Sequence, residues 1–292
     1  MIMRNGLRVL AMSAAVHLSL PAAAFSGPPA LTAAELMQAP SLKRYATALE
    51  NGEIVLLTQP EREEANQLTV LMLVLVPARL QKTMETLQRQ AMAADAAGAL
   101  AAGEIGDSTP AGLDKVLASV AFAADERSEV EKLLAVDAGD SFNFSTEEIA
   151  LISARAKALT DAQKEGDAAL EAMSGAMREV LKGRCLAYLK GGMDGLAPYR
   201  FGPSKQVDPS GELIAATEGL RLVRERFPDY YDCLRHYPEK MPPKLAHRYF
   251  WAKQTEADRP LFVLKHWILD VQPDYALITE RRFYLSHSLS SL

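Results

Sequence analysis

The sequence predicts an α+β fold in which a curved antiparallel sheet carries a large helical insertion. Short runs typical of β-strands stand towards both ends of the chain, and a long stretch with helical spacing separates them. The last three of these runs follow one another closely, which favours antiparallel pairing. The chain has 292 residues, 49% of them hydrophobic, and this is enough apolar material for a sizeable core.

Residues 1–24 have the features of a cleaved secretory signal peptide. Arg4 and Arg8 give a positive start, residues 9–20 form an apolar run, and residues 21–24 (PAAA) supply a small-residue cleavage site. The apolar run is shorter than the roughly 20 residues that a membrane-spanning helix requires. We therefore predict an exported protein, periplasmic or secreted, whose mature chain has no transmembrane segment.

Residues 25–292 are predicted to form a single domain in three sections. In the first section, residues 53–90, two β-type runs at 53–59 and 68–76 are followed by a helix that begins at Pro77. The second run is apolar on both faces, so we expect it to be a covered or central strand.

Residues 91–190 are predicted to be the helical insertion. Its first part, residues 91–112, is rich in Ala and Gly and has few large side chains, so we expect a loose helix or an exposed lid. Asp125 and Ser145 are good N-cap residues, and Ser145 with Glu148 forms a capping-box pattern. The insertion therefore consists of several capped helices.

The third section, residues 191–292, is predicted to contain a loop, a helix and the C-terminal strands. The helix is expected near residues 212–226. Three β-type runs follow it, at residues 247–254, 261–271 and 275–292. Residues 272–274 (QPD) are a short connection between the last two runs, which indicates a hairpin.

Two cysteines, Cys185 and Cys233, are present. In an oxidising compartment thiols tend to pair, so a disulfide between them is one interpretation. The alternative is two buried thiols, each acting as a small hydrophobic residue on a helix. The sequence leaves both interpretations open.

The hairpin brings one candidate catalytic pair together. If its turn centres on Pro273, antiparallel pairing places His266 opposite Glu280. A histidine and a carboxylate inside an apolar cavity would form an acid–base pair. A register shift of one residue separates them onto opposite faces, and an ion pair on the solvent face is the alternative.

The aromatic residues of the last strands are candidates to line a pocket. Trp251 and Trp267 belong to a set of large rings at alternating positions, which line a cavity or fill a core equally well. Arg282 and Tyr284 are candidates to bind a polar or anionic end, because a guanidinium group matches carboxylate and phosphate. Arg281 and Arg282 are adjacent, so at most one of them points inward, and a solvated charge at the sheet edge is the alternative.

Residues 184–292 resemble a family of uncharacterised exported bacterial proteins. The shared pattern comprises Tyr188, Gly191, Gly192, Leu196, Tyr199, Leu234, Tyr237, Pro238, Phe250, Trp251, Lys253, Pro260, His266, Phe283, Tyr284, Ser286 and His287. The resemblance implies no particular activity, and it adds His287 to the candidate ligand-binding residues. Chains of that family continue beyond the Ser-His strand, so we expect this sequence to be truncated at its C-terminus.

The order of elements also resembles the helix-grip fold of START-type and polyketide-cyclase-type lipid-binding domains. The shared order is strand, strand, a helix that begins with Pro-Ala, a helical insertion and then antiparallel strands. The resemblance implies a curved sheet that wraps a long helix around an apolar cavity. It implies a lipid as the ligand class.

Composition and motifs narrow the functional classes. The net charge of −5 and pI near 5.7 argue against nucleic acid as a partner, because such binding depends on clustered Lys and Arg. None of the motifs H-E-x-x-H, G-x-x-x-x-G-K, G-x-G-x-x-G and G-x-S-x-G is present, and no metal or cofactor is predicted. We expect an exported protein that binds a lipid or other hydrophobic small molecule. The alternatives are an enzyme that uses the same cavity and a structural or assembly protein of the cell envelope.

Overall fold

The computed structural model describes residues 43–58, 70–73, 81–86, 99–136, 141–202, 204–272 and 276–287. Two compact units make up the chain. Unit 1 comprises Met1–Arg89 and Leu269–Ile278, and unit 2 comprises Gln90–Ile268 and Thr279–Leu292. The predicted signal peptide, residues 1–24, and most of the predicted 272–274 connection lie outside the described residues.

Unit 1 contains a small antiparallel sheet. Strand β1 (Val55–Thr58) pairs with β2 (Val70–Leu73), with Val55 opposite Leu73. Helix α3 (Ala46–Glu50) precedes them, and residues 81–86 are helical. The two predicted β-type runs of the first section are thus confirmed as strands, and they form a sheet of their own.

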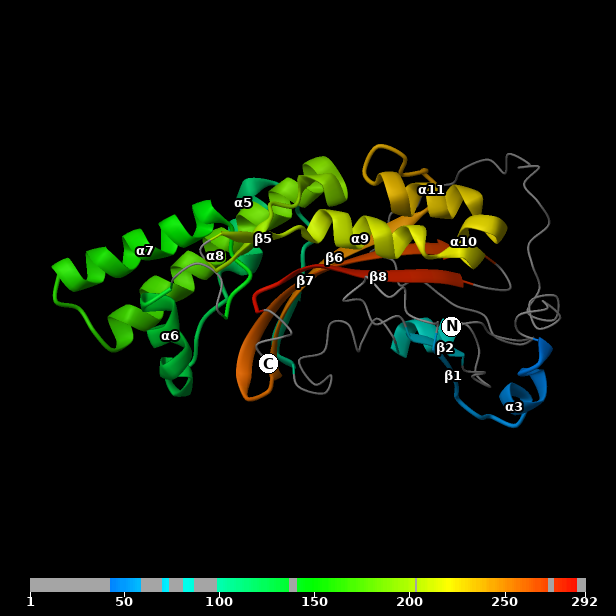
Figure 1. Cartoon of the computed structure of the whole chain (residues 1–292), viewed down its shortest axis with the longest axis horizontal. Coiled ribbons are helices and arrows are strands. Elements are labelled where there is room, and N and C mark those ends of the chain that lie inside the picture. Colours follow the sequence, from blue (N-terminus) through cyan, green and yellow to red (C-terminus); the bar gives the residue numbers. More distant parts are fainter. Residues whose placement is uncertain are drawn as a thin grey trace. The chain divides into compact units, whose positions relative to one another are not determined.

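Unit 2 is built on a four-stranded antiparallel sheet, which confirms the α+β class (Figure 1). The strand order is β3 (Ala99–Glu104), β6 (Ala246–Glu256), β7 (Arg259–Val271) and β8 (Ala276–Leu285), and the ends of β7 and β8 lie in unit 1. The last three strands correspond to the predicted C-terminal runs. They bend along their length, so the sheet is curved.

Helices fill the chain between β3 and β6. They are α5 (Pro110–Leu117), η1 (Ala124–Glu126), α6 (Arg127–Leu134), α7 (Thr146–Asp161), α8 (Asp167–Gly191), η2 (Gly192–Gly195), α9 (Pro209–Glu218), α10 (Arg221–Arg226) and α11 (Pro228–His236). A short hairpin of β4 (Tyr199–Phe201) and β5 (Lys205–Val207) lies between η2 and α9. The single helix predicted at residues 212–226 is in fact two, because the chain turns at Gly219. Asp125 lies within η1 rather than at an N-cap.

Strand β3 corrects the prediction for residues 99–104, which belong to the stretch 91–112 that was expected to form a loose helix or an exposed lid. Residues 91–98 of that stretch lie outside the described residues. The strand also means that the predicted insertion, residues 91–190, includes one strand of the main sheet. Gly103 lies opposite Trp251 in the register of β3 and β6. A side-chain carbon at Gly103 would lie 2.5 Å from Trp251 Nε1, so only glycine leaves room for the indole ring.

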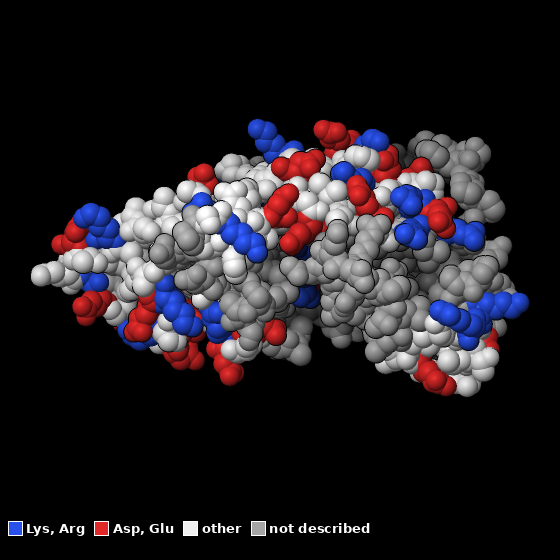
Figure 2. Space-filling view, in the orientation of Figure 1, with Lys and Arg blue, Asp and Glu red and all other residues white. Residues whose placement is uncertain are grey.

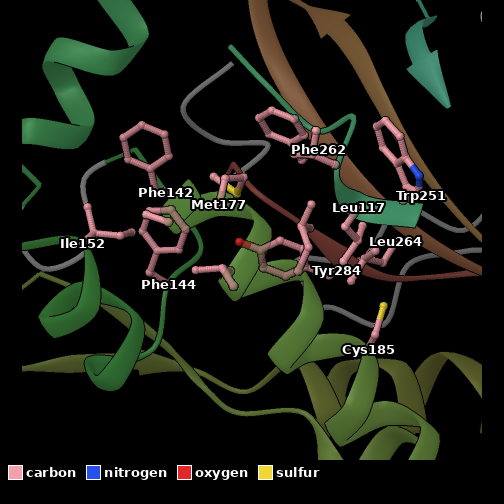
Figure 3. Packing of buried hydrophobic residues seen from close by; sticks show 14 of the residues in the cluster. Leu117, Phe142, Phe144, Ile152, Met177, Cys185, Trp251, Phe262, Leu264 and Tyr284 are labelled. Atoms are coloured by element: carbon pink, nitrogen blue, oxygen red, sulfur yellow. The ribbon is translucent and has the colours of Figure 1, made fainter. Parts of the chain in front are cut away.

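Helix α8 packs against one face of the sheet and forms the centre of the core. Buried residues of α8 join large side chains of the strands, among them Trp251, Phe262, Leu264 and Tyr284 (Figure 3). Alternate residues face the other side of the sheet, where the ring of Phe250 contacts that of Trp267 at a centroid distance of 5.5 Å. Both faces of β6 and β7 therefore carry buried apolar side chains.

The predicted capping box at the start of α7 is confirmed. The Ser145 hydroxyl accepts a hydrogen bond from the Glu148 N–H, and the Glu148 carboxylate accepts one from the Ser145 N–H at 2.6 Å. The same carboxylate binds Arg184 of α8, so the cap also joins the two helices.

Replacing Ser145 with alanine is expected to lower the free energy of unfolding by about 1 kcal/mol, because the Glu148 N–H then loses its side-chain acceptor. Urea unfolding followed by circular dichroism would measure the change. Ser153→Ala, at an exposed position of the same helix, is the matched control and should change stability little. An equal effect of both substitutions would contradict the capping role.

The surface of unit 2 carries charges of both signs. Acidic and basic side chains are interspersed over the described residues in the view of Figure 2. Within the described part of the chain, no helix combines the length and the apolar character needed to cross a bilayer.

Candidate functional site

Side chains from separate elements of unit 2 meet in a buried group, the histidine–tyrosine cluster. Its members are Tyr188 of α8, Tyr237 just after α11, His247 and Tyr249 of β6, His266 of β7 and Arg281 of β8. His266 is fully buried at the centre, and its ring centroid lies 4.4 Å from that of Tyr249 and 4.6 Å from that of Tyr237. The Phe283 ring stacks on Tyr188 at 4.0 Å and closes one side.

Hydrogen bonds determine which ring nitrogen of His266 carries the proton. Arg281 Nη1 donates to the Tyr188 hydroxyl oxygen at 3.1 Å, and this hydroxyl lies 2.9 Å from His266 Nδ1. An arginine can only donate hydrogen bonds, so the Tyr188 hydroxyl oxygen accepts from Arg281. The hydroxyl hydrogen is then donated to His266 Nδ1. The proton of the neutral ring then resides on Nε2, a buried atom that has no hydrogen-bond partner among the described residues.

The cluster reaches the surface at His247. The Tyr237 and Tyr249 hydroxyls are in very close contact, and His247 Nδ1 lies 3.1 Å from the Tyr249 hydroxyl. Tyr237 and Tyr249 are buried, whereas His247 is exposed. A chain of hydrogen-bonding groups therefore leads from solvent to the rings around His266.

Burial keeps the cluster in its neutral forms. Burial and the nearby charges of His247 and Arg281 hold the pKa of His266 well below its ordinary value of 6.5, and burial also lowers the pKa of His247. Burial raises the pKa of Tyr188 to about 12 and raises the pKa of Tyr249 as well. At neutral pH the site is thus uncharged except for the Arg281 guanidinium.

A glycine lets two segments of the cluster approach each other. Gly192 follows α8 with φ of +57°, a conformation that favours glycine, and a side-chain carbon there would lie 1.8 Å from the Tyr237 carbonyl oxygen. The end of α8 and the segment after α11 are therefore in backbone contact. This contact holds Tyr188 and Tyr237 on the same side of His266, with ring centroids 5.5 Å apart.

The predicted His266–Glu280 pair is not formed. Glu280 accepts a hydrogen bond from Trp267 Nε1 at 2.9 Å, whereas His266 bonds to Tyr188. His266 and Trp267 are adjacent on β7 and face opposite sides of the sheet, so Glu280 lies on the side away from the cluster. The prediction that His266 and Glu280 lie on the same face of the sheet is therefore wrong.

The predicted ligand-binding residues are divided between the two faces. Trp267 and Arg282 meet at Glu280, where Arg282 Nε donates to the carboxylate at 2.9 Å and remains half exposed. Trp251 and Tyr284 lie in the core on the α8 side, each with one buried polar atom that has no partner. The inward arginine is Arg281 rather than Arg282.

His287 belongs to a second buried network. Its Nε2 lies 2.7 Å from Glu129 Oε1, and its Nδ1 lies 2.7 Å from the Ser286 hydroxyl. Arg259 also binds the Glu129 carboxylate, through Nη2 at 2.6 Å. All three members of the His287 chain are at most 2% exposed, so this network fastens the end of β8 to α6.

The disulfide that the sequence left open is not formed between the two cysteines. Cys185 and Cys233 are buried free thiols, as the alternative interpretation held. Burial raises the pKa of Cys185 to about 12 and that of Cys233 to about 11, which keeps both protonated and unreactive.

Sequence reasoning selected His266 but missed its partners. Tyr188, Tyr237 and Arg281 come from distant segments, so spacing does not reveal that they meet. The pattern on which the predicted family resemblance depends includes Tyr188, Gly192, Tyr237 and His266, and this was the available signal. Within the described residues, no group of three or more His, Cys, Asp or Glu side chains is placed to hold a metal ion.

A scan against protein-family models, a search of curated proteins and a search of solved structures each found no match to this chain. Its function must therefore be inferred from the site itself.

Proposed function

We propose that this is an exported binding protein for a lipid or other largely apolar small molecule that ends in a carbonyl or carboxylate group. The polar end of the ligand would accept a hydrogen bond at the histidine–tyrosine cluster. The observation that carries the proposal is the buried, unpartnered Nε2 of His266. The basic start and apolar run of residues 1–24 support export.

An unpartnered buried donor is unfavourable by about 1–3 kcal/mol, and native proteins rarely leave one without a purpose. A ligand oxygen at His266 Nε2 would recover this free energy. The tautomer set by Tyr188 makes Nε2 a donor, so the ligand group must be an acceptor. This requirement favours a carbonyl or carboxylate over an amine.

Arg281 adds a positive field at the same place. Its described hydrogen bonds end on the Tyr188 hydroxyl, the Leu234 carbonyl and, at 3.4 Å, the Thr217 hydroxyl. None of these acceptors is a carboxylate. The guanidinium charge is therefore not neutralised by these bonds, and it favours a partially or fully negative ligand group nearby.

The aromatic walls suit the apolar part of such a ligand. Rings of Tyr237, Tyr249 and His247 surround the approach to His266, and they offer apolar faces with polar edges. These rings are packed together, so the ligand must displace His247, the exposed member. Transfer of apolar ligand surface out of water, about 25 cal/mol per Å², supplies the driving force.

Protein purified from the periplasm is expected to release a bound lipid on solvent extraction and to bind a dansyl-labelled fatty acid. His266→Asn places an amide near the Nδ1 position and loses the distal donor, whereas His266→Gln reaches the Nε2 position and keeps a donor there. His266→Asn should therefore weaken binding about tenfold or more, and His266→Gln should weaken it far less. Fluorescence titration would measure both.

His236→Gln is the matched control, because His236 is an exposed residue of α11 that pairs with Asp232 outside the cluster. It should leave affinity unchanged. Recovery of ligand-free protein that binds no labelled fatty acid would overturn the proposal. Equal affinities of His266→Asn and His266→Gln would place the ligand elsewhere.

A further inference from the structure

A surface groove of about 630 Å³ lies between helices α5, α7 and α8, apart from the histidine–tyrosine cluster. Its volume is within the range of small-molecule sites, about 300–1,000 Å³. Its polar lining comprises Asp114, Arg155, Glu171, Arg178 and Glu179, with Gly175 at the floor. Acidic and basic groups thus face the same space.

Two guanidinium groups converge over Gly175. A methyl group at this position would lie 3.5 Å from Arg155 Nη1 and 3.7 Å from Arg178 Nη2. A ligand oxygen above Gly175 would therefore be within reach of both arginines. Paired guanidinium groups are the usual protein partners of carboxylates.

Packing does not require glycine at this point. Contacts of 3.5 Å or more are ordinary, so alanine would fit, and alanine is the better residue inside a helix. The groove nonetheless has glycine at its floor. The missing methyl group leaves open the place where the two guanidinium groups meet.

Each arginine is paired with an exposed glutamate. Arg155 binds Glu179, whose side chain is 48% exposed, and Arg178 binds Glu171, whose side chain is 74% exposed. Ion pairs with such exposed partners are weak and readily exchanged. A ligand carboxylate that displaced the glutamates would free two carboxylates beside it.

We propose that this groove binds a small zwitterion, a free α-amino acid or a short peptide. The ligand carboxylate lies over Gly175 between Arg155 and Arg178, and the ligand ammonium group is received by Glu171 or Glu179. A doubly charged anion such as phosphate is disfavoured because it would displace Glu171 and Glu179 from the arginines without offering either glutamate a cation. The inference does not depend on the proposed lipid site.

Isothermal titration of the full chain with L-alanine and with L-alanyl-L-alanine tests the proposal and distinguishes the two ligand sizes. Saturable binding of at least one is expected. Propionate and ethylamine each carry one half of the zwitterion and should bind at least about tenfold more weakly. Arg155→Gln should reduce affinity for the zwitterion about tenfold or more, since it removes a charge-assisted hydrogen bond.

Gly175→Ala and Gly183→Ala form a matched pair on α8. A side-chain carbon at Gly183 meets nothing within 4 Å, so both substitutions favour the helix but only Gly175→Ala enters the groove. Gly175→Ala should weaken binding about tenfold, because its methyl group occupies the carboxylate position. Gly183→Ala should bind as the wild type does.

Three results would overturn the inference. The first is that neither zwitterion binds to the wild-type chain. The second is that propionate or phosphate binds as well as the zwitterion. The third is that Gly175→Ala and Arg155→Gln both retain full affinity. Because Gly175→Ala is expected to fold at least as well as the wild type, its loss of binding cannot be attributed to unfolding.

Discussion

Replacing Glu129 with alanine is expected to lower the free energy of unfolding by about 3–5 kcal/mol. Glu129 is 2% exposed and accepts hydrogen bonds from Arg259, from Lys132 at 3.1 Å and from His287. Its removal leaves the Arg259 guanidinium, whose side chain is 14% exposed, without its buried counter-charge. It also leaves His287 Nε2 without an acceptor in the interior.

Urea unfolding followed by tryptophan fluorescence would measure this loss. Glu131→Ala is the matched control, since Glu131 is an exposed residue of the same helix, and it should change stability by less than about 0.5 kcal/mol. Glu129→Gln keeps the side-chain shape and one acceptor, so its effect should be intermediate. A loss below about 1 kcal/mol for Glu129→Ala would show that the network contributes little.

Acidification from pH 6.5 to pH 5 is expected to destabilise the protein, because two buried histidines bind protons less readily in the folded state than in the unfolded chain. Burial lowers the pKa of both His266 and His287 below the ordinary value of 6.5. The unfolded chain therefore binds more protons than the folded chain as the pH falls through 6.5. Stability is complete above pH 6.5 and is lost below it, by up to about 1.4 kcal/mol per pH unit for each such histidine.

The acidic partner of His287 does not contribute in this range. Hydrogen bonds from His287 and Arg259 outweigh burial and lower the pKa of Glu129 below its ordinary value of 4.5, so its contribution is complete at pH 5 and is lost only at lower pH. Urea midpoints between pH 7.5 and pH 5 would therefore report the histidines. His266→Gln should flatten the profile, and His236→Gln should leave it unchanged. A wild-type profile that is flat over this range would contradict the assignment of neutral buried histidines.

The sequence was sufficient to predict most elements of the fold. The alternation of β6 to β8 and the capping box at Ser145 are local signals, and each corresponds to an element of the structure. Strand β3, the break near Gly219 and the short β4–β5 hairpin were not predicted. The hairpin depends on contacts with another segment of the chain. One such contact is the hydrogen bond from the Arg200 N–H to the Phe144 carbonyl at 2.8 Å.

The candidate site was predictable only in part. His266 was selected because it stands on an apolar strand, but its partner was misplaced because a turn of uncertain centre fixes register only to within one residue. The sequence could not predict that Tyr188 and Arg281 belong to the site, for a different reason. They contact His266 through the packing of α8 and β8, and neither spacing nor composition encodes that packing.

Gly103 and Trp251 lie opposite each other on β3 and β6, so the space that the indole ring fills is the space that a side chain at position 103 would need. An added carbon on the first strand would require a smaller ring on the second, so neither residue can vary alone. The glycine at position 103 is thus explained by an indole ring that lies far along the chain.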